Sequence, residues 1–178
     1  MQASWGRMIA GIAGLCLALL AGFSQAQDKL EPAIWIDPDG CEHWVIDDGA
    51  EGFMSPNLQP DGRPVCREKS VCGIVETDIL FAFNSFRISG AGRDTLERVF
   101  KSTSARAFIV TGHTDNIGSD ETNMVLSQRR ADAVARVGKS IGAPIIDAVG
   151  HGERWPRASN ETIQGRRDNR RVEILCLR

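Results

Sequence analysis

The chain has 178 residues, of which 42% are hydrophobic and 25% are charged. This composition is typical of an ordinary globular protein and excludes collagen, a coiled coil and a largely disordered chain. The 21 basic and 23 acidic residues give a formal net charge of -2, so the chain has no excess of positive charge to attract a phosphate backbone, and nucleic acid is not an expected partner. The length predicts one domain with a small extension.

The N-terminus has the pattern of a secretory signal. An apolar run over residues 8–23 follows a stretch whose only charge is Arg7, and it ends at Ser24-Gln25-Ala26. The run is shorter than the roughly 20 residues of a membrane-spanning helix, and the small residues after it suit cleavage before Gln27. We therefore predict a signal peptide over residues 1–26 and export to the periplasm, with an uncleaved N-terminal anchor as the alternative.

Four of the five cysteines follow the predicted signal, and an even number in an oxidising compartment predicts two disulfides. These four are Cys41, Cys66, Cys72 and Cys176. No two are spaced as Cys-x-x-Cys and the three histidines are scattered, so neither a zinc site nor a redox pair is predicted, and no cofactor is expected. Cys16 lies inside the apolar run without a preceding lipidation box, so a lipid anchor is not expected either.

Residues 27–69 are rich in Gly, Pro and Asp, which mark turns. Short strands, such as residues 43–46, fit between these turns. A segment of this size cannot build much core, and a bridge between Cys41 and Cys66 would add roughly 3 kcal/mol by closing a loop of about 25 residues. We predict a small N-terminal extension stapled by that disulfide.

From residue 70 to 178 the pattern changes to alternating strands and helices. The periodicity predicts helices over residues 92–102 and 121–140, with a short helix before the last strand. The predicted strands cover residues 79–83, 107–111, 145–149 and 172–176. The order β-α-β-α-β-(α)-β indicates an α/β sandwich in which helices cover one mixed sheet.

This strand order bears on the disulfide pairing. If the last strand runs antiparallel beside the first, Cys176 comes close to Cys72, which leaves Cys41 to pair with Cys66. This is one of the three connectivities that four cysteines allow.

The long predicted helix carries a charge in its apolar stripe. At about 100° per residue from Leu126, the stripe centres near 35° and Arg130 falls near 40°, with Asn123 on the same face near 60°. A guanidinium cannot be deprotonated in a protein and is costly to desolvate without an anionic partner. Arg130 therefore pairs with a carboxylate of the chain, extends past the strand ends to water, or meets an anionic ligand.

A polar, glycine-punctuated loop over residues 112–118 leads from the strand at residues 107–111 into this helix. Ligands of α/β sheets usually bind at this position, outside the carboxyl ends of the strands. We expect Asp115 of the loop and Arg130 of the helix to face one cleft. One acid and one base suit a zwitterion with an ammonium and a carboxylate, and the helix N-terminus adds backbone N–H donors.

Four ordered blocks of the sequence have a more specific pattern. They are GHTDNIG from residue 112, NMVLSQRRADAV from 123, GHGERWP from 150 and NETIQGRRDNRRVEI from 160. These blocks resemble the GHTDxxG, NxxLSxxRAxxV, GxGExxP and N…GRxxNRRVEI motifs of the OmpA-like, peptidoglycan-associating domain family. The resemblance covers roughly residues 79–177. Asn84 stands where that family often has Asp, outside the proposed site.

The resemblance implies non-covalent binding of peptidoglycan at the diamino acid of its stem peptide, usually meso-diaminopimelate. It implies that Asp115 binds the ammonium of the diamino acid and Arg130 its carboxylate. The other ligand-binding residues that it implies are Asn123, Asn116, Ile117, Gly118 and Arg171. A module of this kind holds the cell wall and links it to the outer membrane through an envelope protein.

Three alternatives stay open at the level of sequence. In the first, Arg170 and Arg171 have structural roles instead of binding a ligand: one covers the sheet end while the other pairs with Glu173 or Asp168.

In the second, the chain is a protein-interaction adaptor whose active surface is the extension. Trp35, Trp44 and Phe53 are then its anchors, unless they form a miniature core. In the third, the chain is a wall hydrolase that uses His113 and Asp115. No nucleophile elbow or metal triad accompanies these two residues, so we expect no enzymatic activity.

Overall fold

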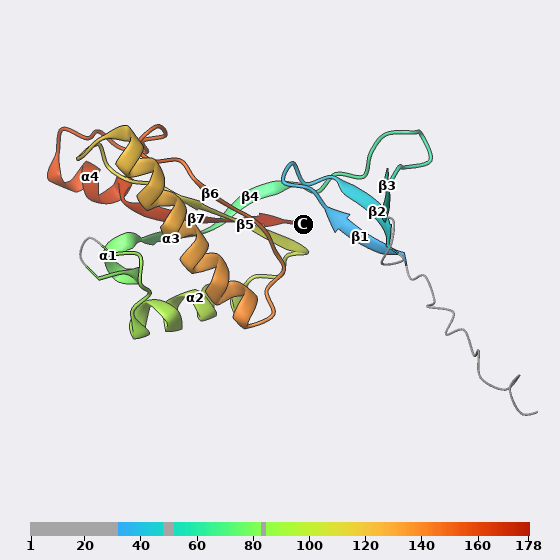
Figure 1. Cartoon of the computed structure of the whole chain (residues 1–178), viewed down its shortest axis with the longest axis horizontal. Helices are drawn as coiled ribbons and strands as arrows, with labels where there is room; N and C mark the ends of the chain where they lie inside the picture. Colours follow the sequence, from blue (N-terminus) through green and yellow to red (C-terminus); the bar gives the residue numbers. More distant parts are fainter. Residues whose placement is uncertain (1–31, 48–51, 83–84) are drawn as a thin grey trace, which may run out of the picture.

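The computed structural model describes residues 32–47, 52–82 and 85–178 (Figure 1). The predicted signal peptide lies outside these ranges, as do Phe83 and Asn84. Within them, no helix combines the length and the apolar character needed to cross a lipid bilayer.

A four-stranded mixed sheet forms the larger part of the molecule. Its strands are β4 (Lys69–Glu76), β5 (Ala107–Gly112), β6 (Ile145–Gly150) and β7 (Arg171–Leu177), in the order β4-β7-β5-β6. Strand β7 runs antiparallel to both β4 and β5, whereas β5 and β6 are parallel. Helices α2 (Gly90–Ser102) and α3 (Asp120–Ser140) pack on the sheet (Figure 1). The predicted α/β sandwich with a mixed sheet is confirmed.

The main core lies between the sheet and these two helices. Val110, Val172 and Ile174 of the strands pack with Leu96 of α2 and Val134 of α3, and all five side chains are fully buried. Each such side chain contributes about 1.5–3 kcal/mol by leaving water. Because neighbouring strand residues point to opposite faces, Arg171 and Glu173 lie on the face of β7 that the helices do not cover.

The strand predicted over residues 79–83 is wrong. Residues Thr77–Leu80 form a single helical turn, α1, and Phe81 makes only an isolated bridge with Ile88. The first strand of the main sheet is instead β4, directly before this turn. Leu80 and Phe81 are buried, but Leu80 lies in the helical turn and Phe81 directly follows it. A short apolar run in the sequence does not distinguish a strand from a buried turn of this kind.

Both predicted disulfides are present and confirm the pairing. Cys72 lies where the register of β4 shifts against β7, and it bonds to Cys176 of β7. Cys41 bonds to Cys66, and the two residues also form an antiparallel bridge. The pairing depends on a first strand that runs antiparallel beside the last strand. That first strand is β4 and not residues 79–83.

The N-terminal part folds into a separate three-stranded antiparallel sheet. Its strands are β1 (Ala33–Ile36), β2 (Glu42–Asp47) and β3 (Gly52–Pro56), in that order. Ile36 packs with Ala107 and Leu177 of the main sheet, and the buried carboxylate of Glu42 pairs with Arg67. Figure 1 shows this small sheet at the end of the main sheet away from α1 and α4 (Ile163–Asn169). The boundary at residue 69 stays a prediction.

The first half of α3 packs directly against the ends of β5 and β6. A Cβ atom on Gly112 or Gly150 would collide with the backbone of Ser127 or Gln128, so the two glycines permit this contact. The side chain of Gln128 secures it, because its Oε1 accepts a hydrogen bond from the Gly150 N–H at 2.8 Å. The glycines of two motif blocks therefore set the position of the helix that carries Asn123 and Arg130.

Removal of the Cys72–Cys176 disulfide is expected to destabilise the protein more than removal of Cys41–Cys66. The two bonds span 104 and 25 residues, for which the chain-entropy model gives about 4.7 and about 3 kcal/mol. Urea unfolding of the paired Cys→Ser variants measures both losses. An equal or smaller loss for the Cys72–Cys176 variant would contradict this order.

Candidate functional site

A cleft of about 560 Å³ opens at the edge of the sheet where β4 and β5 end and β7 begins. Its lining comes from α1, from the loop after β5, from α3 and from the turn between α4 and β7. Asp115 and Arg130, which the sequence places in one cleft, both line it. The parallel direction of β5 and β6 brings the loops after these strands to the same edge.

Asp115 is held in a fixed position on the loop after β5. Its Oδ1 accepts a hydrogen bond from the Ile117 N–H at 3.2 Å, and its Oδ2 accepts one from Arg170 Nη1 at 2.9 Å. The side chain of Asp115 is 9% exposed. A carboxylate offers about four acceptor positions, so two bonds leave room for a further donor.

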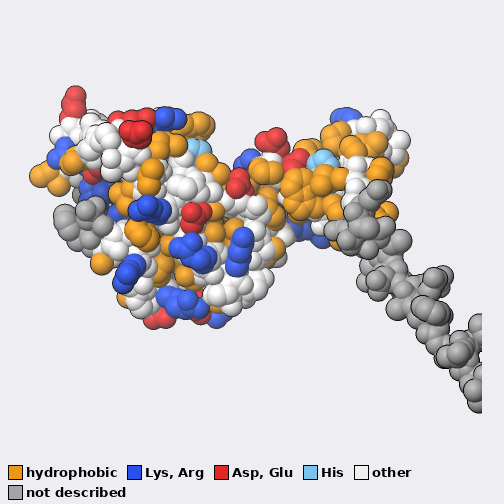
Figure 2. All heavy atoms as spheres, viewed as in Figure 1, with side chains coloured by type: hydrophobic (Ala, Val, Ile, Leu, Met, Phe, Trp, Pro, Cys, Tyr) orange, Lys and Arg blue, Asp and Glu red, His pale blue; other side chains and the backbone are white. Residues whose placement is uncertain are grey.

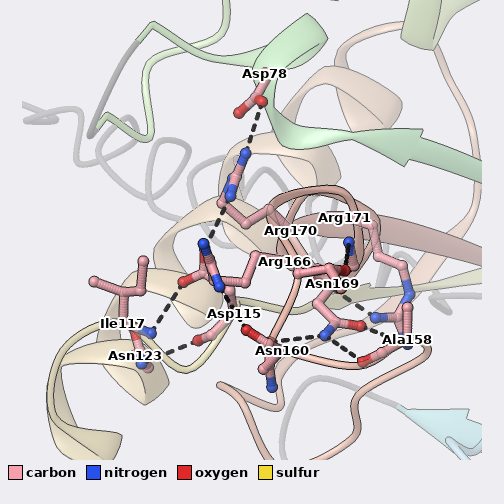
Figure 3. A network of polar contacts seen from close by, with 12 residues as sticks. Asp78, Asp115, Ile117, Asn123, Ala158, Asn160, Arg166, Asn169, Arg170 and Arg171 are labelled. Carbon is pink, nitrogen blue, oxygen red and sulfur yellow. Dashed lines mark hydrogen bonds and ion pairs between the residues drawn. The ribbon is translucent and has the colours of Figure 1, made fainter.

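Arg170 joins the two acids of the cleft. Its Nη2 donates to Asp78 Oδ2 at 3.0 Å while its Nη1 donates to Asp115, so the guanidinium lies between the two carboxylates (Figure 3). The hydrogen bond with Asp78 raises the pKa of Arg170, against an opposing effect of burial. This bridge ties α1 to the loop after β5 and fixes both anionic groups at the cleft wall.

Arg130 is buried within the apolar side of α3, as its periodicity predicts. Its Nε donates to the Ser85 carbonyl oxygen at 3.2 Å, and its guanidinium lies 5.3 Å from the centre of the Phe81 ring. Burial lowers the pKa of Arg130, and the nearby Asp78 opposes this effect. In the part of the chain that the structure describes, no carboxylate lies within 4.0 Å of this guanidinium. It remains cationic, with donors to spare.

Asn123 connects the cleft to the neighbouring loop. Its Nδ2 donates to the Asp115 carbonyl oxygen at 3.2 Å and to Glu153 Oε2 at 2.6 Å. Ile117 also lines the cleft, although its side chain is exposed. Asn116 and Gly118 flank Ile117 in the loop but do not line the cleft, and Gly118 adopts a left-handed φ of 109° that turns the chain toward α3.

Two threonine hydroxyls of the cleft wall have no hydrogen-bond partner. Thr77 of α1 and Thr114 of the loop are both buried, and in the described part of the chain neither Oγ1 finds a donor or acceptor. A buried hydroxyl without a partner costs about 1–3 kcal/mol. Both residues line the cleft, but their hydroxyl oxygens are themselves buried and do not face its open space.

Arg171, predicted to border the site, does not line the cleft. It is buried on the sheet face away from α2 and α3, where its Nε donates to Glu173 Oε1 at 2.6 Å and its Nη2 to the Trp155 carbonyl oxygen at 3.3 Å. Its neighbour Arg170 takes the place at the cleft. Arg170 is the last residue before β7 and Arg171 the first residue in it, and only Arg170 faces the cleft.

The last motif block holds the loop between β6 and α4. The fully buried side chain of Asn169 accepts hydrogen bonds from the backbone N–H groups of Arg157 and Ala158, and it donates to Asn160 (Figure 3). A Cβ on Gly165 would collide with the Ser159 carbonyl. These motif residues therefore fix the loop, away from the cleft lining.

Sequence reasoning missed Asp78 and Thr77 and left Arg170 undecided. The sequence pattern gives no signal for Asp78 and Thr77, because it predicts that residues 77–80 precede or begin a strand. A helical turn in the same place brings both side chains to the cleft wall.

His113 also lies outside the cleft lining, although it is two residues from Asp115. Its ring is 3% exposed and packs against His151 at 5.2 Å between ring centres. Burial, together with the positive charge of Arg171, lowers the pKa of His113 to about 4. In the described ranges, no group of three His, Cys, Asp or Glu side chains is placed to hold a metal ion.

The fold and the cleft define a small α/β domain with a charged, partly buried ligand site at one edge of its sheet. The sequence pattern of the OmpA family matches residues 80–170. The chain belongs to the OmpA family, as the four motif blocks predicted.

Several known proteins are similar to this chain. The outer membrane porin F of Pseudomonas aeruginosa is 32% identical over 91% of this chain and 48% of its own length. The outer membrane protein A of Bordetella avium is 37% identical over 65% of this chain and 61% of its length. The outer-membrane lipoprotein YfiB of P. aeruginosa is 37% identical over 76% of this chain and 83% of its own length. The chain thus spans about half to three fifths of the first two relatives.

Solved structures show the same fold. The cell wall anchor of the type VI secretion system from P. aeruginosa is 32% identical, with a TM-score of 0.50 over 58% of this chain and 78% of its own. The periplasmic domain of Helicobacter pylori MotB is 25% identical, with a TM-score of 0.50 over 57% of this chain and 78% of its own. Both cover little more than half of this chain.

Acidification below neutral pH is expected to destabilise the protein through His113. Its folded pKa of about 4 lies below the 6.5 of an unfolded histidine, so the unfolded state binds more protons between these values. The contribution of neutral His113 to the free energy of unfolding is complete above pH 6.5 and is lost as the pH falls towards 4. His151, Arg171 and Glu173 are the charged or titratable groups that face it.

An NMR titration of the His113 ring, with urea unfolding at pH 7, 5.5 and 4.5, measures this effect. His113→Gln is expected to flatten the pH dependence of the free energy of unfolding over this range. A ring that titrates near 6.5 in the folded protein would contradict the assignment.

Proposed function

We propose that the chain binds peptidoglycan non-covalently and that the diamino acid of the stem peptide, meso-diaminopimelate, occupies the cleft. One observation carries this proposal: Asp115 and Arg130 line a single cleft with opposite charges, and the guanidinium has no carboxylate partner within 4.0 Å in the described part of the chain. The binding residues proposed are Asp115, Arg130, Asn123 and the loop of residues 116–118, with Arg170 in the place expected for Arg171.

The chemistry of the ligand fits the charges of the cleft. The far end of meso-diaminopimelate in a stem peptide carries a free ammonium and a free carboxylate on one carbon. Asp115 accepts hydrogen bonds from the ammonium, while Arg130 donates to the carboxylate in the bidentate manner that its planar group allows.

The relatives support this function and its location. One similar structure is that of a cell wall anchor and another is a periplasmic domain, and the similar full-length proteins are proteins of the outer membrane. We therefore place the chain in the cell envelope, bound to the wall. The specificity for diaminopimelate rests on the cleft itself.

We propose binding without catalysis. The hydrolase alternative needs His113 and Asp115 to act on one bond, but only Asp115 lines the cleft while His113 is buried beside His151. The carboxylate of Asp115 is already engaged by Arg170 and the Ile117 N–H. This arrangement suits a fixed anionic contact better than a general base.

Contact of the extension with an envelope protein is a second candidate function. Trp35, Trp44 and Phe53 are 43%, 42% and 64% exposed, so they do not form the miniature core that was the alternative. Figure 2 shows hydrophobic side chains gathered over this part of the molecule. Exposed aromatic side chains are the usual anchors of protein interfaces.

Asp115→Ala and Arg130→Ala are each expected to weaken binding to purified sacculi at least tenfold, because each removes a charge-assisted contact worth about 1.5–3 kcal/mol. Co-sedimentation with sacculi measures the loss. Asp94→Ala and Arg98→Ala, exposed on α2 far from the cleft, make the same charge changes and serve as controls. Wild-type sedimentation of both cleft variants, with circular dichroism unchanged, would refute the proposal.

Thr114→Val is expected to separate binding from stability. The Thr114 hydroxyl has no partner, so replacing it with a methyl group leaves the free energy of unfolding unchanged or raises it by about 1 kcal/mol. Affinity for a diaminopimelate-containing stem peptide, measured by calorimetry, should stay unchanged, because the hydroxyl is buried behind the cleft surface. A less stable variant, or one that binds the stem peptide more weakly, would contradict this prediction.

A further inference from the structure

Trp155 presents an aromatic ring to solvent from a fixed support. It lies in the loop between β6 and α4, and it is 66% exposed. Its ring stacks on His151, with 5.2 Å between ring centres and 20° between the planes. His151 in turn packs against His113, which is 3% exposed. One face of the indole is therefore covered by a stack that is rooted in the protein.

The backbone of the same loop is also fixed. The carbonyl oxygen of Trp155 accepts a hydrogen bond from Arg171 Nη2 at 3.3 Å, and Arg171 is held by Glu173. Two residues further on, the Arg157 N–H donates to the buried Asn169 side chain at 2.7 Å. The ring is fixed by its stack on His151, and the backbone is fixed by these hydrogen bonds. Such a side chain loses little conformational entropy when a ligand stacks on its exposed face.

The loop is joined to the rim of the cleft. Glu153 accepts a hydrogen bond at 2.6 Å from Asn123, which lines the cleft. Trp155 is two residues beyond Glu153, and two residues span at most about 7 Å. The aromatic ring and the cleft therefore belong to the same end of the molecule.

We propose that the exposed face of Trp155 binds a sugar ring of the peptidoglycan glycan strand whose stem peptide occupies the cleft. This inference rests on the proposed function. The face of an indole carries negative charge, and one side of a pyranose ring carries positively polarised C–H groups, so the two stack. The shape of the surface fits this occupant, because a flat ring beside a loop of polar residues suits a saccharide.

The dimensions of the ligand allow both contacts at once. The diamino acid is the third residue of the stem, whose first residue is attached to the sugar. Three extended residues span about 10 Å, whereas at most about 7 Å of backbone separates Trp155 from Glu153 at the rim of the cleft. The two contacts then act as linked sites, so the second adds affinity without a further loss of translational freedom.

The test compares two probes by calorimetry: a free tripeptide stem with diaminopimelate, and the same tripeptide attached to its disaccharide. The wild-type chain is expected to bind the disaccharide-peptide about threefold to tenfold more tightly than the free peptide. Trp155→Ala should bind the free peptide normally and lose this advantage, while Trp155→Phe, which keeps an aromatic face, should retain most of it.

The matched control is Trp35→Ala, which removes a tryptophan that is 43% exposed on the extension and should change neither affinity. Equal wild-type affinities for the two probes, or an advantage that survives in Trp155→Ala, would overturn this inference alone. Wild-type binding of neither probe would overturn the proposed function instead. If Trp155→Ala lost only the capture of an envelope protein, the ring would be a protein anchor and the inference would be wrong.

Discussion

The buried guanidinium of Arg130 is the constraint around which the cleft is organised. Arg130 is 6% exposed on the side of α3 that packs on the sheet, and it meets open space only at the cleft. The Ser85 carbonyl and the Phe81 ring compensate part of its lost hydration. In the proposed complex, the carboxylate of the ligand supplies the anionic partner that the guanidinium lacks. An ion pair formed in a partly desolvated site is stronger than the same pair in water.

Arg170 suits the cleft to the zwitterion that we propose as its ligand. Two arginines alone would favour any anion, but Arg170 is neutralised by Asp78 and Asp115 together. The four charged groups of the cleft sum to zero, with an acid available on one side and Arg130 on the other. A ligand with only one charge gains one contact at the expense of leaving the other group unsatisfied, whereas a zwitterion matches both.

The two ends of the main sheet are built for different tasks. The cleft and Trp155 lie at the end where β4 finishes, while the extension packs on Leu177 at the other end of the antiparallel partner β7. The Cys72–Cys176 bond joins these two strands near the extension. If the cleft holds the wall as proposed, the exposed aromatic side chains at the other end suit the chain to connecting two components of the cell envelope.

The sequence by itself predicted helices α2, α3 and α4, three of the four main strands, and Asp115, Arg130 and Asn123 as cleft residues, because periodicity and motif spacing are local properties. It predicted the disulfide pairing only on the condition that the first and last strands are antiparallel neighbours, and the structure met this condition. Only the tertiary structure decided that residues 77–80 form a turn of helix, that Asp78 and Thr77 join the cleft, and that Arg170 faces the cleft while Arg171 supports Trp155. These outcomes depend on which strand lies at the sheet edge and on the side to which each strand residue points, and neither is fixed until the sheet has formed its register.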